Sequence, residues 1–148
     1  MNRYTPFDGQ IRLVFVFQVP SFWPSWDSLY KACVKDERFD VRFVLIDDLV
    51  TGDTAQMMNA IAFLKKKGIS YSLFRPEEVL AFRPHYMIYQ TPYDKGHRPQ
   101  AYWTMRYRSN GARIVYIPYG IEISDTAESR YKHYTLPPVL NAFRIYVM

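Results

Sequence analysis

Apolar runs along the chain alternate with segments whose apolar residues recur at helical spacing. Residues 11–18 (IRLVFVFQ) are almost continuously β-branched or aromatic, which is typical of a strand buried on both faces of a parallel sheet. Shorter runs of the same character follow at residues 40–47, 70–74, 85–90 and 113–118. The pattern therefore predicts five strands.

Helices are predicted between these runs, over residues 25–36, 53–68, 76–82 and 100–111. The segment 53–68 is the clearest of them, because its apolar residues share one face and Gly68 can end it. Asp53 with Gln56 predicts a capping box at its start, and Ser25 predicts an N-cap for the first helix. Beyond residue 124 the pattern weakens, and residues 136–148 could begin either a helix or a strand.

Alternation of strand and helix predicts an α/β fold, a Rossmann-like three-layer sandwich. Right-handed crossovers favour a five-stranded parallel sheet with the order 3-2-1-4-5. A chain of 148 residues suits a single domain over residues 1–148 with a substantial core. Hydrophobic residues make up 49% and charged residues 22%, a balance that is ordinary for a globular protein and argues against disorder.

Two of the predicted strands end in the same pattern, Gln-x-Pro. It occurs in FQVPSFWPSW (residues 17–26) and in YQTPYDKGHRP (residues 89–99). In the predicted order these strands are neighbours whose chains leave in opposite directions, and ligands bind in that crevice at the carboxyl ends of the strands. Gln18 and Gln90 would then offer amides to a ligand. The alternative is that the pattern only ends the strands and that the amides satisfy backbone groups.

The second loop carries further candidates for ligand binding. Tyr93 could stack on a base or sugar, Asp94 could accept hydrogen bonds from sugar hydroxyls, and Arg98 could hold a phosphate. Asp94 could equally form a local turn with the residues that follow it.

Other candidates lie in the loops after the first, second and fifth strands. Trp23 could form a ligand wall or an interdomain contact, and Gly120 could allow close approach of a ligand or form a plain turn. Asp47 and Asp48 could hold a ribose or a metal, or simply lead into a helix. The complete set of predicted substrate-binding residues is Gln18, Ser21, Trp23, Gln90, Tyr93, Asp94, Arg98, Tyr119, Gly120 and Glu122.

The net charge of +5 arises in one segment. Residues 95–115 contain five Lys or Arg and no Asp or Glu, while the other 14 basic residues equal the 14 acidic ones in number. The segment indicates an anionic partner, or else a solvated helix face. Nucleic acid is the weaker interpretation, because one helix that mixes aromatic and basic residues is not a complete single-strand site.

Several classes of chemistry lack their motifs. The chain has neither the G-x-G-x-x-G dinucleotide motif nor a P-loop, and no G-x-S-x-G nucleophile motif. We therefore expect no cofactor. His85, His97 and His133 lack the spacing of metal ligands and are interpreted as ordinary surface or strand residues, so no metal is expected. With one cysteine, no signal peptide and no membrane-spanning run, a cytoplasmic location is expected.

Three stretches resemble the amino-terminal half of CDP-glycerol glycerophosphotransferase-like proteins, the teichoic-acid polymerases and their relatives of GT-B-like fold. They are VFVFQVPSFWPSWDSLYKACVKDERFDVRFVLI, YQTPYDKGHRP and RIVYIPYGI. The resemblance implies that residues 18–26, 90–98 and 119–122 line an interdomain cleft. It also implies that this half faces a phosphate-rich or polyprenol-linked acceptor at the inner face of the plasma membrane, while a carboxyl-terminal domain holds the nucleotide donor.

The sequence departs from that family at one motif. Where the polymerases carry a Trp-His-Gly-like motif after the comparable strand, this chain reads Pro118-Tyr119-Gly120, so the histidine proposed there as a base is absent. At 148 residues, the sequence is expected to hold one of the two domains of such a transferase. We therefore expect one half of a larger enzyme of cell-surface polymer synthesis, inactive by itself and with no catalytic residue assigned. The alternative is a non-catalytic α/β domain that binds a small ligand or a protein through its Tyr- and Trp-rich edge.

Overall fold

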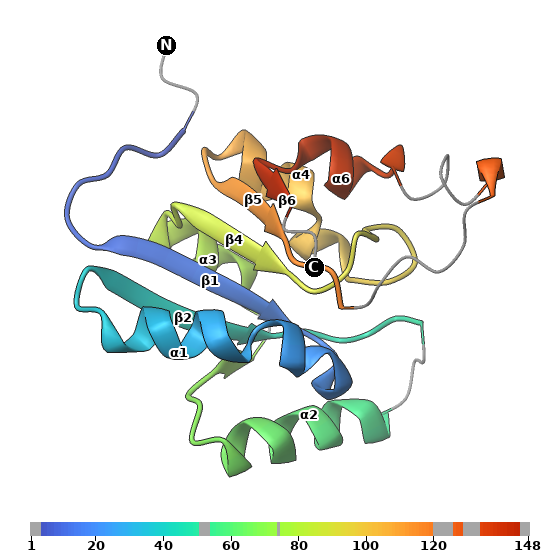
Figure 1. The fold of residues 1–148 in the computed structure, drawn as a ribbon, viewed down its shortest axis with the longest axis horizontal. Coiled ribbons are helices and arrows are strands. Elements are labelled where there is room, and N and C mark those ends of the chain that lie inside the picture. Colours follow the sequence, from blue (N-terminus) through green and yellow to red (C-terminus); the bar gives the residue numbers. More distant parts are fainter. Residues whose placement is uncertain (1–3, 51–53, 74, 120–125, 129–133, 146–148) are drawn as a thin grey trace.

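A computed structural model describes residues 4–50, 54–73, 75–119, 126–128 and 134–145. Within these residues the sheet has six strands in the order β3-β2-β1-β4-β5-β6, and every neighbouring pair is parallel. The strands are β1 (Ile11–Phe17), β2 (Phe39–Leu45), β3 (Ser72–Leu73), β4 (Tyr86–Tyr89), β5 (Arg113–Tyr116) and β6 (Arg144–Ile145). The predicted α/β fold and the order 3-2-1-4-5 are confirmed (Figure 1). The prediction of five strands was one short, because β6 adds to the outer edge of β5.

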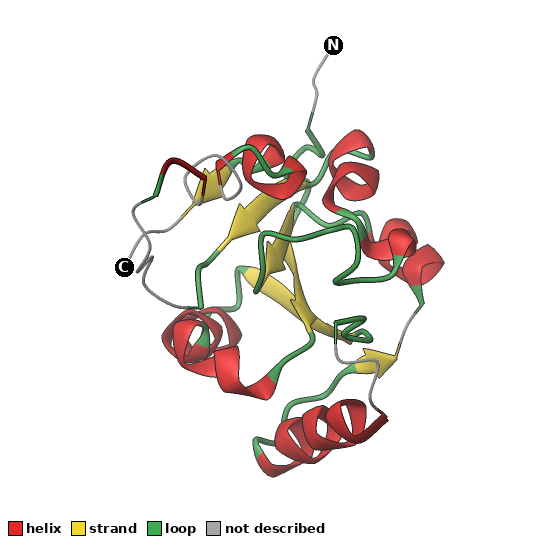
Figure 2. Ribbon diagram, turned by 90° about the vertical axis from the view of Figure 1, so that its right-hand side faces the viewer, coloured by secondary structure: helices red, strands yellow, loops and turns green. Residues whose placement is uncertain are grey.

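Helices lie on both sides of the sheet (Figure 2). The described α-helices are α1 (Asp27–Lys35), α2 (Thr54–Lys66), α3 (Pro76–Phe82), α4 (Thr104–Ser109) and α6 (Pro137–Asn141). Two 3-10 helices, η1 (Pro20–Ser25) and η2 (Gln100–Tyr102), precede α1 and α4. The sheet and its two helical layers form the predicted three-layer sandwich.

The two faces of β1 explain why its sequence lacks an alternation of apolar and polar residues. Leu13, Phe15 and Phe17 pack in one core cluster with residues of η1, α1 and α2. Val14 and Val16 pack in a second cluster with residues of α3, η2 and α4. Since successive side chains of a strand point to opposite faces, a strand covered on both sides must be apolar throughout.

Two predicted details of the helices were wrong, and a third falls partly outside the described residues. Ser25 does not cap α1, because its hydroxyl donates to the Phe22 carbonyl at 2.8 Å. The predicted capping box of Asp53 with Gln56 stays a prediction, because Asp53 lies outside the described residues; the Gln56 Nε2 donates to Asp48 Oδ2 at 3.1 Å. The predicted helix over residues 100–111 is interrupted at Trp103, whose φ of −63° and ψ of 141° are extended. Gly68 does follow α2 with a φ of +68°, the left-handed conformation expected there.

The carboxyl ends of four strands meet at one edge of the sheet. Beyond the strand ends, the Ile46 amide donates to the Phe17 carbonyl at 3.0 Å and the Ile117 amide to the Tyr89 carbonyl at 3.3 Å. The loops after β1, β2, β4 and β5 therefore all leave at this edge, which we call the carboxyl edge. The chain reverses its direction of winding between β1 and β4, the place where ligands bind in folds of this type.

Candidate functional site

Gln90 joins the loop after β4 to the loop after β1. Its Oε1 accepts hydrogen bonds from the backbone N–H groups of Gln18 at 2.9 Å and Val19 at 3.2 Å. Its Nε2 donates to the Val19 carbonyl at 3.2 Å. Gln90 is buried, and its bond to the Gln18 N–H is buried with it, while the two bonds to Val19 are partly buried.

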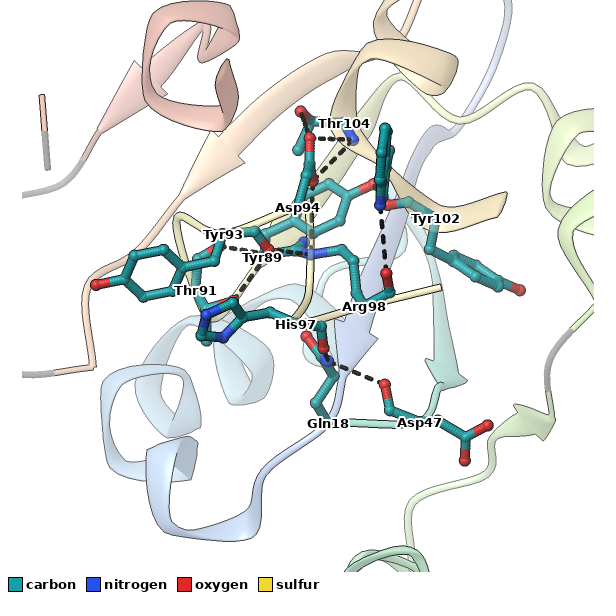
Figure 3. Close-up of polar contacts among 11 residues, drawn as sticks. Gln18, Asp47, Tyr89, Thr91, Tyr93, Asp94, His97, Arg98, Tyr102 and Thr104 are labelled. Carbon is teal, nitrogen blue, oxygen red and sulfur yellow. Dashed lines mark hydrogen bonds and ion pairs between the residues drawn. The ribbon is translucent and has the colours of Figure 1, made fainter. Parts of the chain in front are cut away.

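Gln18 joins three loops at the same edge. Its Nε2 donates to the Asp47 carbonyl at 3.1 Å and to the His97 carbonyl at 2.9 Å, and the residue is buried (Figure 3). The two glutamines therefore bind the chain's own loops and do not present free amides at the sheet edge. In both Gln-x-Pro loops the glutamine amide is bonded to the backbone of a neighbouring loop. This agrees with the alternative that the two amides satisfy backbone groups.

Arg98 lies inside the loop after β4. Its Nε donates to the Tyr93 carbonyl at 2.7 Å, and its Nη2 donates to the carbonyl of Thr91 at 2.6 Å and to its hydroxyl at 2.8 Å (Figure 3). The guanidinium carbon lies 4.5 Å from the centre of the Tyr89 ring, a cation–π arrangement. The residue is only 1% exposed, so the guanidinium is not open to a ligand phosphate, contrary to the prediction.

The charge of Arg98 is compensated within the loop. Burial lowers the pKa of Arg98, but a guanidinium remains a cation at any physiological pH. The Asp94 carboxylate lies 3.5 Å from its Nε, and both groups are buried. Nη1 has no hydrogen-bond partner in the described part of the chain, so Asp94 and the Tyr89 ring add to the hydrogen bonds that Nε and Nη2 make.

Asp94 holds the beginning of α4. Both carboxylate oxygens accept from the Thr104 backbone N–H at 3.2 Å, and Oδ2 also accepts from the Thr104 hydroxyl at 2.7 Å. The Asp94 carbonyl accepts from the N–H groups of His97 and Arg98, which closes the local turn. A role in binding sugar hydroxyls is therefore not supported, because the carboxylate is 7% exposed and occupied by α4 and Arg98.

The basic segment 95–115 does not form one open cationic surface. Arg106 pairs with Glu77 at 3.3 Å, and Arg108 donates to Asn141. Arg113 lies over the rings of Tyr4 and Phe7, at 4.7 Å from each. With Arg98 buried, these four arginines have partners within the protein, and the exposed Lys95 is the remaining cation.

Aromatic pairs stand on the loops of the carboxyl edge. The rings of Phe22 and Tyr119 stack at 3.9 Å, with Tyr119 42% exposed. The ring of Tyr93 stacks on that of His97 at 4.4 Å and an interplanar angle of 24°. The first pair joins the loops after β1 and β5. The second pair fixes two side chains within the loop after β4.

The remaining predicted residues have different places. Trp23 belongs to η1 and is buried in the core, where its indole N–H donates to Asp27 of α1 at 2.6 Å, so it forms no exposed ligand wall. Ser21 is exposed on η1. Gly120 and Glu122 lie outside the described residues, as does His133.

His97 is the residue that the sequence interpretation missed. It was taken as an ordinary residue, yet its carbonyl is held by Gln18 and by the Leu49 N–H at 3.1 Å. Burial lowers the pKa of His97, while the Asp48 carboxylate raises it and Arg98 lowers it. Its position in the loop after β4, where ligands bind in such folds, was the signal that could have identified it.

His85 is fully buried at the opposite end of β4. Nδ1 accepts from the Arg12 backbone N–H at 2.9 Å, and Nε2 lies 2.7 Å from the Pro6 carbonyl, to which it donates. Burial lowers the pKa of His85, and the charges of Arg12 and Arg113 lower it further, while Pro6 and Asp8 raise it. The fold therefore favours the neutral ring, which alone can accept from Arg12.

We predict that the free energy of unfolding decreases as the pH falls below the ordinary histidine value of 6.5. The pKa of His85 is lower in the folded protein than in the unfolded chain, so the unfolded chain takes up the proton first as the pH falls. The stabilisation is complete above 6.5 and is lost as the pH falls through the folded pKa. One such proton gives a slope of at most about 1.4 kcal/mol per pH unit. Urea unfolding between pH 7.5 and 5 measures it.

The matched variant is His85→Asn, whose side-chain oxygen can replace Nδ1 as the acceptor for Arg12. Its stability should depend less on pH over the same interval. The part that remains is expected from His97, whose pKa is lowered as well. An unchanged slope in His85→Asn would show that His85 is not responsible.

A cavity of about 260 Å³ lies elsewhere, beside α3 and the edge strand β3. None of the predicted site residues lines it. Its two charged residues already have partners, since Arg42 lies over the Phe82 ring at 3.7 Å and Glu78 pairs with Arg75 at 2.8 Å. We therefore place the candidate site at the carboxyl edge, where loops converge, and not in this cavity.

No protein-family model matches the chain, and no curated protein matches its sequence. Among the described residues no helix has both the length and the apolar character to cross a membrane. Nor does any group of three or more His, Cys, Asp and Glu in this part of the chain have an arrangement that could hold a metal.

Proposed function

We propose that the carboxyl edge is the acceptor-side face of a glycerophospho- or glycosyltransferase of cell-surface polymer synthesis. The observation that carries this proposal is the joining of the loops after β1, β2 and β4 by Gln18 and Gln90 at the point where the winding reverses. A rigid edge of this kind can present side chains to a ligand without having to order them first. The sequence resemblance to CDP-glycerol glycerophosphotransferase-like proteins agrees with this position.

Exposed apolar side chains support a partner at the same edge. Leu49 and Val50, on the loop after β2, are 47% and 58% exposed, and Tyr119 after β5 is 42% exposed. Exposed apolar groups near a ligand site are typical of a surface that another domain covers. The partner we propose is a second transferase domain that carries the nucleotide donor. A cytoplasmic position at the inner face of the plasma membrane belongs to the same proposal.

The acceptor would not be held by the predicted basic segment. The arginines at positions 98, 106, 108 and 113 have partners within the protein, so an anionic membrane or a phosphate chain would meet few open cations there. The same observation speaks against nucleic acid, which needs a continuous basic groove. The aromatic pairs and His97 are the better candidates for contact with the acceptor.

The second candidate function is a non-catalytic α/β domain that binds a small ligand or a protein. A non-catalytic domain is favoured by the structural roles of four predicted site residues, which are Gln18, Gln90, Asp94 and Arg98. These side chains were the most polar ones predicted for the site, and they hold loops together. In this case the exposed side chains of the edge would bind a partner without any chemistry.

An NMR titration of the 148-residue chain distinguishes these functions. We expect a glycerol-phosphate oligomer to shift the resonances of Tyr93, His97 and Tyr119, because their rings lie on the carboxyl-edge loops. CDP-glycerol and other nucleotide donors should leave these resonances unchanged. Shifts with nucleotide would move the donor site into this domain and contradict the acceptor-side role. A folded chain that responds to no compound would favour the non-catalytic domain.

A further inference from the structure

His97 has a backbone that three loops hold in place. Its carbonyl accepts from the Leu49 N–H at 3.1 Å and from Gln18 Nε2 at 2.9 Å, and its own N–H donates to the Asp94 carbonyl at 3.3 Å. All three bonds use backbone atoms of His97. The imidazole is thus positioned by the fold without taking part in the bonds that hold the loops.

The imidazole is half-buried and available for a hydrogen bond. It stacks on Tyr93 at 4.4 Å, which fixes the plane of the ring. In the described part of the chain, no protein group is hydrogen-bonded to either of its ring nitrogens. A neutral imidazole offers one donor and one acceptor, a combination that matches a hydroxyl group, which also donates and accepts.

The charges around His97 favour an uncharged ligand group. Asp48 directly precedes Leu49, whose N–H donates to the His97 carbonyl at 3.1 Å, so its carboxylate belongs to the loop that adjoins His97. A carboxylate disfavours an anion at the same place. Asp48 keeps acceptor capacity, since it receives the Val50 N–H on Oδ1 at 3.3 Å and the Gln56 amide on Oδ2 at 3.1 Å. Arg98 is the nearest arginine along the chain, and its guanidinium is buried against Thr91 and Tyr93.

We propose that His97 binds a hydroxyl of the uncharged polyol or sugar part of the acceptor, with Asp48 accepting from a second hydroxyl and Tyr93 positioning the imidazole. This inference rests on the proposed function and names the part of the acceptor that the carboxyl edge recognises. In this arrangement the phosphate groups of the acceptor lie away from the His97 ring, because the Asp48 carboxylate would repel them and the buried Arg98 guanidinium cannot bind them.

The test is a titration of wild type and His97→Ala with a glycerol-phosphate oligomer, followed by the ¹H–¹³C resonances of the histidine rings. The oligomer should shift the His97 ring signal, and His97→Ala should weaken binding by about tenfold or more, as the loss of one or two hydrogen bonds implies. At neutral pH the unfolding midpoint of His97→Ala should change little, because the bonds that hold the loops use backbone atoms of His97 and the variant loses only the ring stack on Tyr93. Inorganic phosphate, which has no polyol, should leave the ring signal unchanged.

Each other result overturns a defined part of the inference. Equal affinity of wild type and His97→Ala would remove His97 from the site while leaving the proposed function intact. A shift of the His97 signal by inorganic phosphate, or a greater loss of affinity in Lys95→Ala than in His97→Ala, would show that the edge recognises phosphate. No binding of the oligomer to folded wild type would contradict the proposed function and this inference with it.

Discussion

Replacement of Arg98 with methionine should lower the free energy of unfolding by about 3–5 kcal/mol, the usual cost of breaking a buried charge pair. The change removes hydrogen bonds to the carbonyls of Thr91 and Tyr93 and the cation over the Tyr89 ring. It also leaves the Asp94 carboxylate buried without its positive partner. Urea unfolding monitored by tryptophan fluorescence measures the change.

Two further variants identify the cause. Lys95→Met removes a cation from the same loop at an exposed position, so it should leave the unfolding midpoint almost unchanged. Arg98→Lys keeps the charge but cannot reproduce the fork of donors that reaches Thr91 and Tyr93, so it should recover only part of the loss. If Arg98→Met were as stable as wild type, Arg98 would have no structural role and would again be a candidate for ligand binding.

Arg98 also shows what sequence reasoning could not reach. A short polar loop containing Tyr, Asp, His and Arg is typical of a binding site, and the sequence offers no sign that Arg98 is buried. Its partners, Thr91 and Tyr93, are near neighbours in the sequence, but only the folded loop turns their carbonyls inward. The sequence of residues 95–115 therefore suggested a more basic surface than the folded segment presents.

The strand order could be predicted because it follows from general rules. Alternating apolar runs and amphipathic segments, with right-handed crossovers, leave few arrangements of a parallel sheet. β6 could not be predicted in the same way, since Arg144 and Ile145 are both exposed and form a strand of two residues. Its position depends on pairing with β5, more than 25 residues earlier in the chain.

The place of the candidate site was predictable, but the roles of its residues were not. Gln18 and Gln90 were expected at neighbouring strand ends, and they are in contact there. Whether an amide faces a ligand or a backbone group depends on a contact between residues 72 positions apart, which spacing along the chain does not encode. His97 was overlooked for the same reason, because its carbonyl is held by residues of two other loops.

Gln90→Ala should lower the free energy of unfolding by about 2–4 kcal/mol, because each buried polar group left without a partner costs about 1–3 kcal/mol. The backbone N–H groups of Gln18 and Val19 would lose their acceptor, whereas the Val19 carbonyl would still accept from the Phe22 N–H at 3.2 Å. Replacement with glutamate should also destabilise, since a buried carboxylate would face the Val19 carbonyl. Urea unfolding of the variants measures both effects.

Gln18→Ala is the matched comparison and should cost less than Gln90→Ala. Of the two carbonyls that lose the Gln18 amide, that of His97 still accepts from Leu49, so fewer backbone groups are left without a partner. The His97 ring should nevertheless become less ordered, because one of the bonds that fix its backbone is gone. Equal stability of Gln90→Ala and wild type, with loss of oligomer binding, would show that the amide serves a ligand. A large loss of stability would show that Gln-x-Pro joins the loops, and that recognition belongs to the side chains which these loops hold in position.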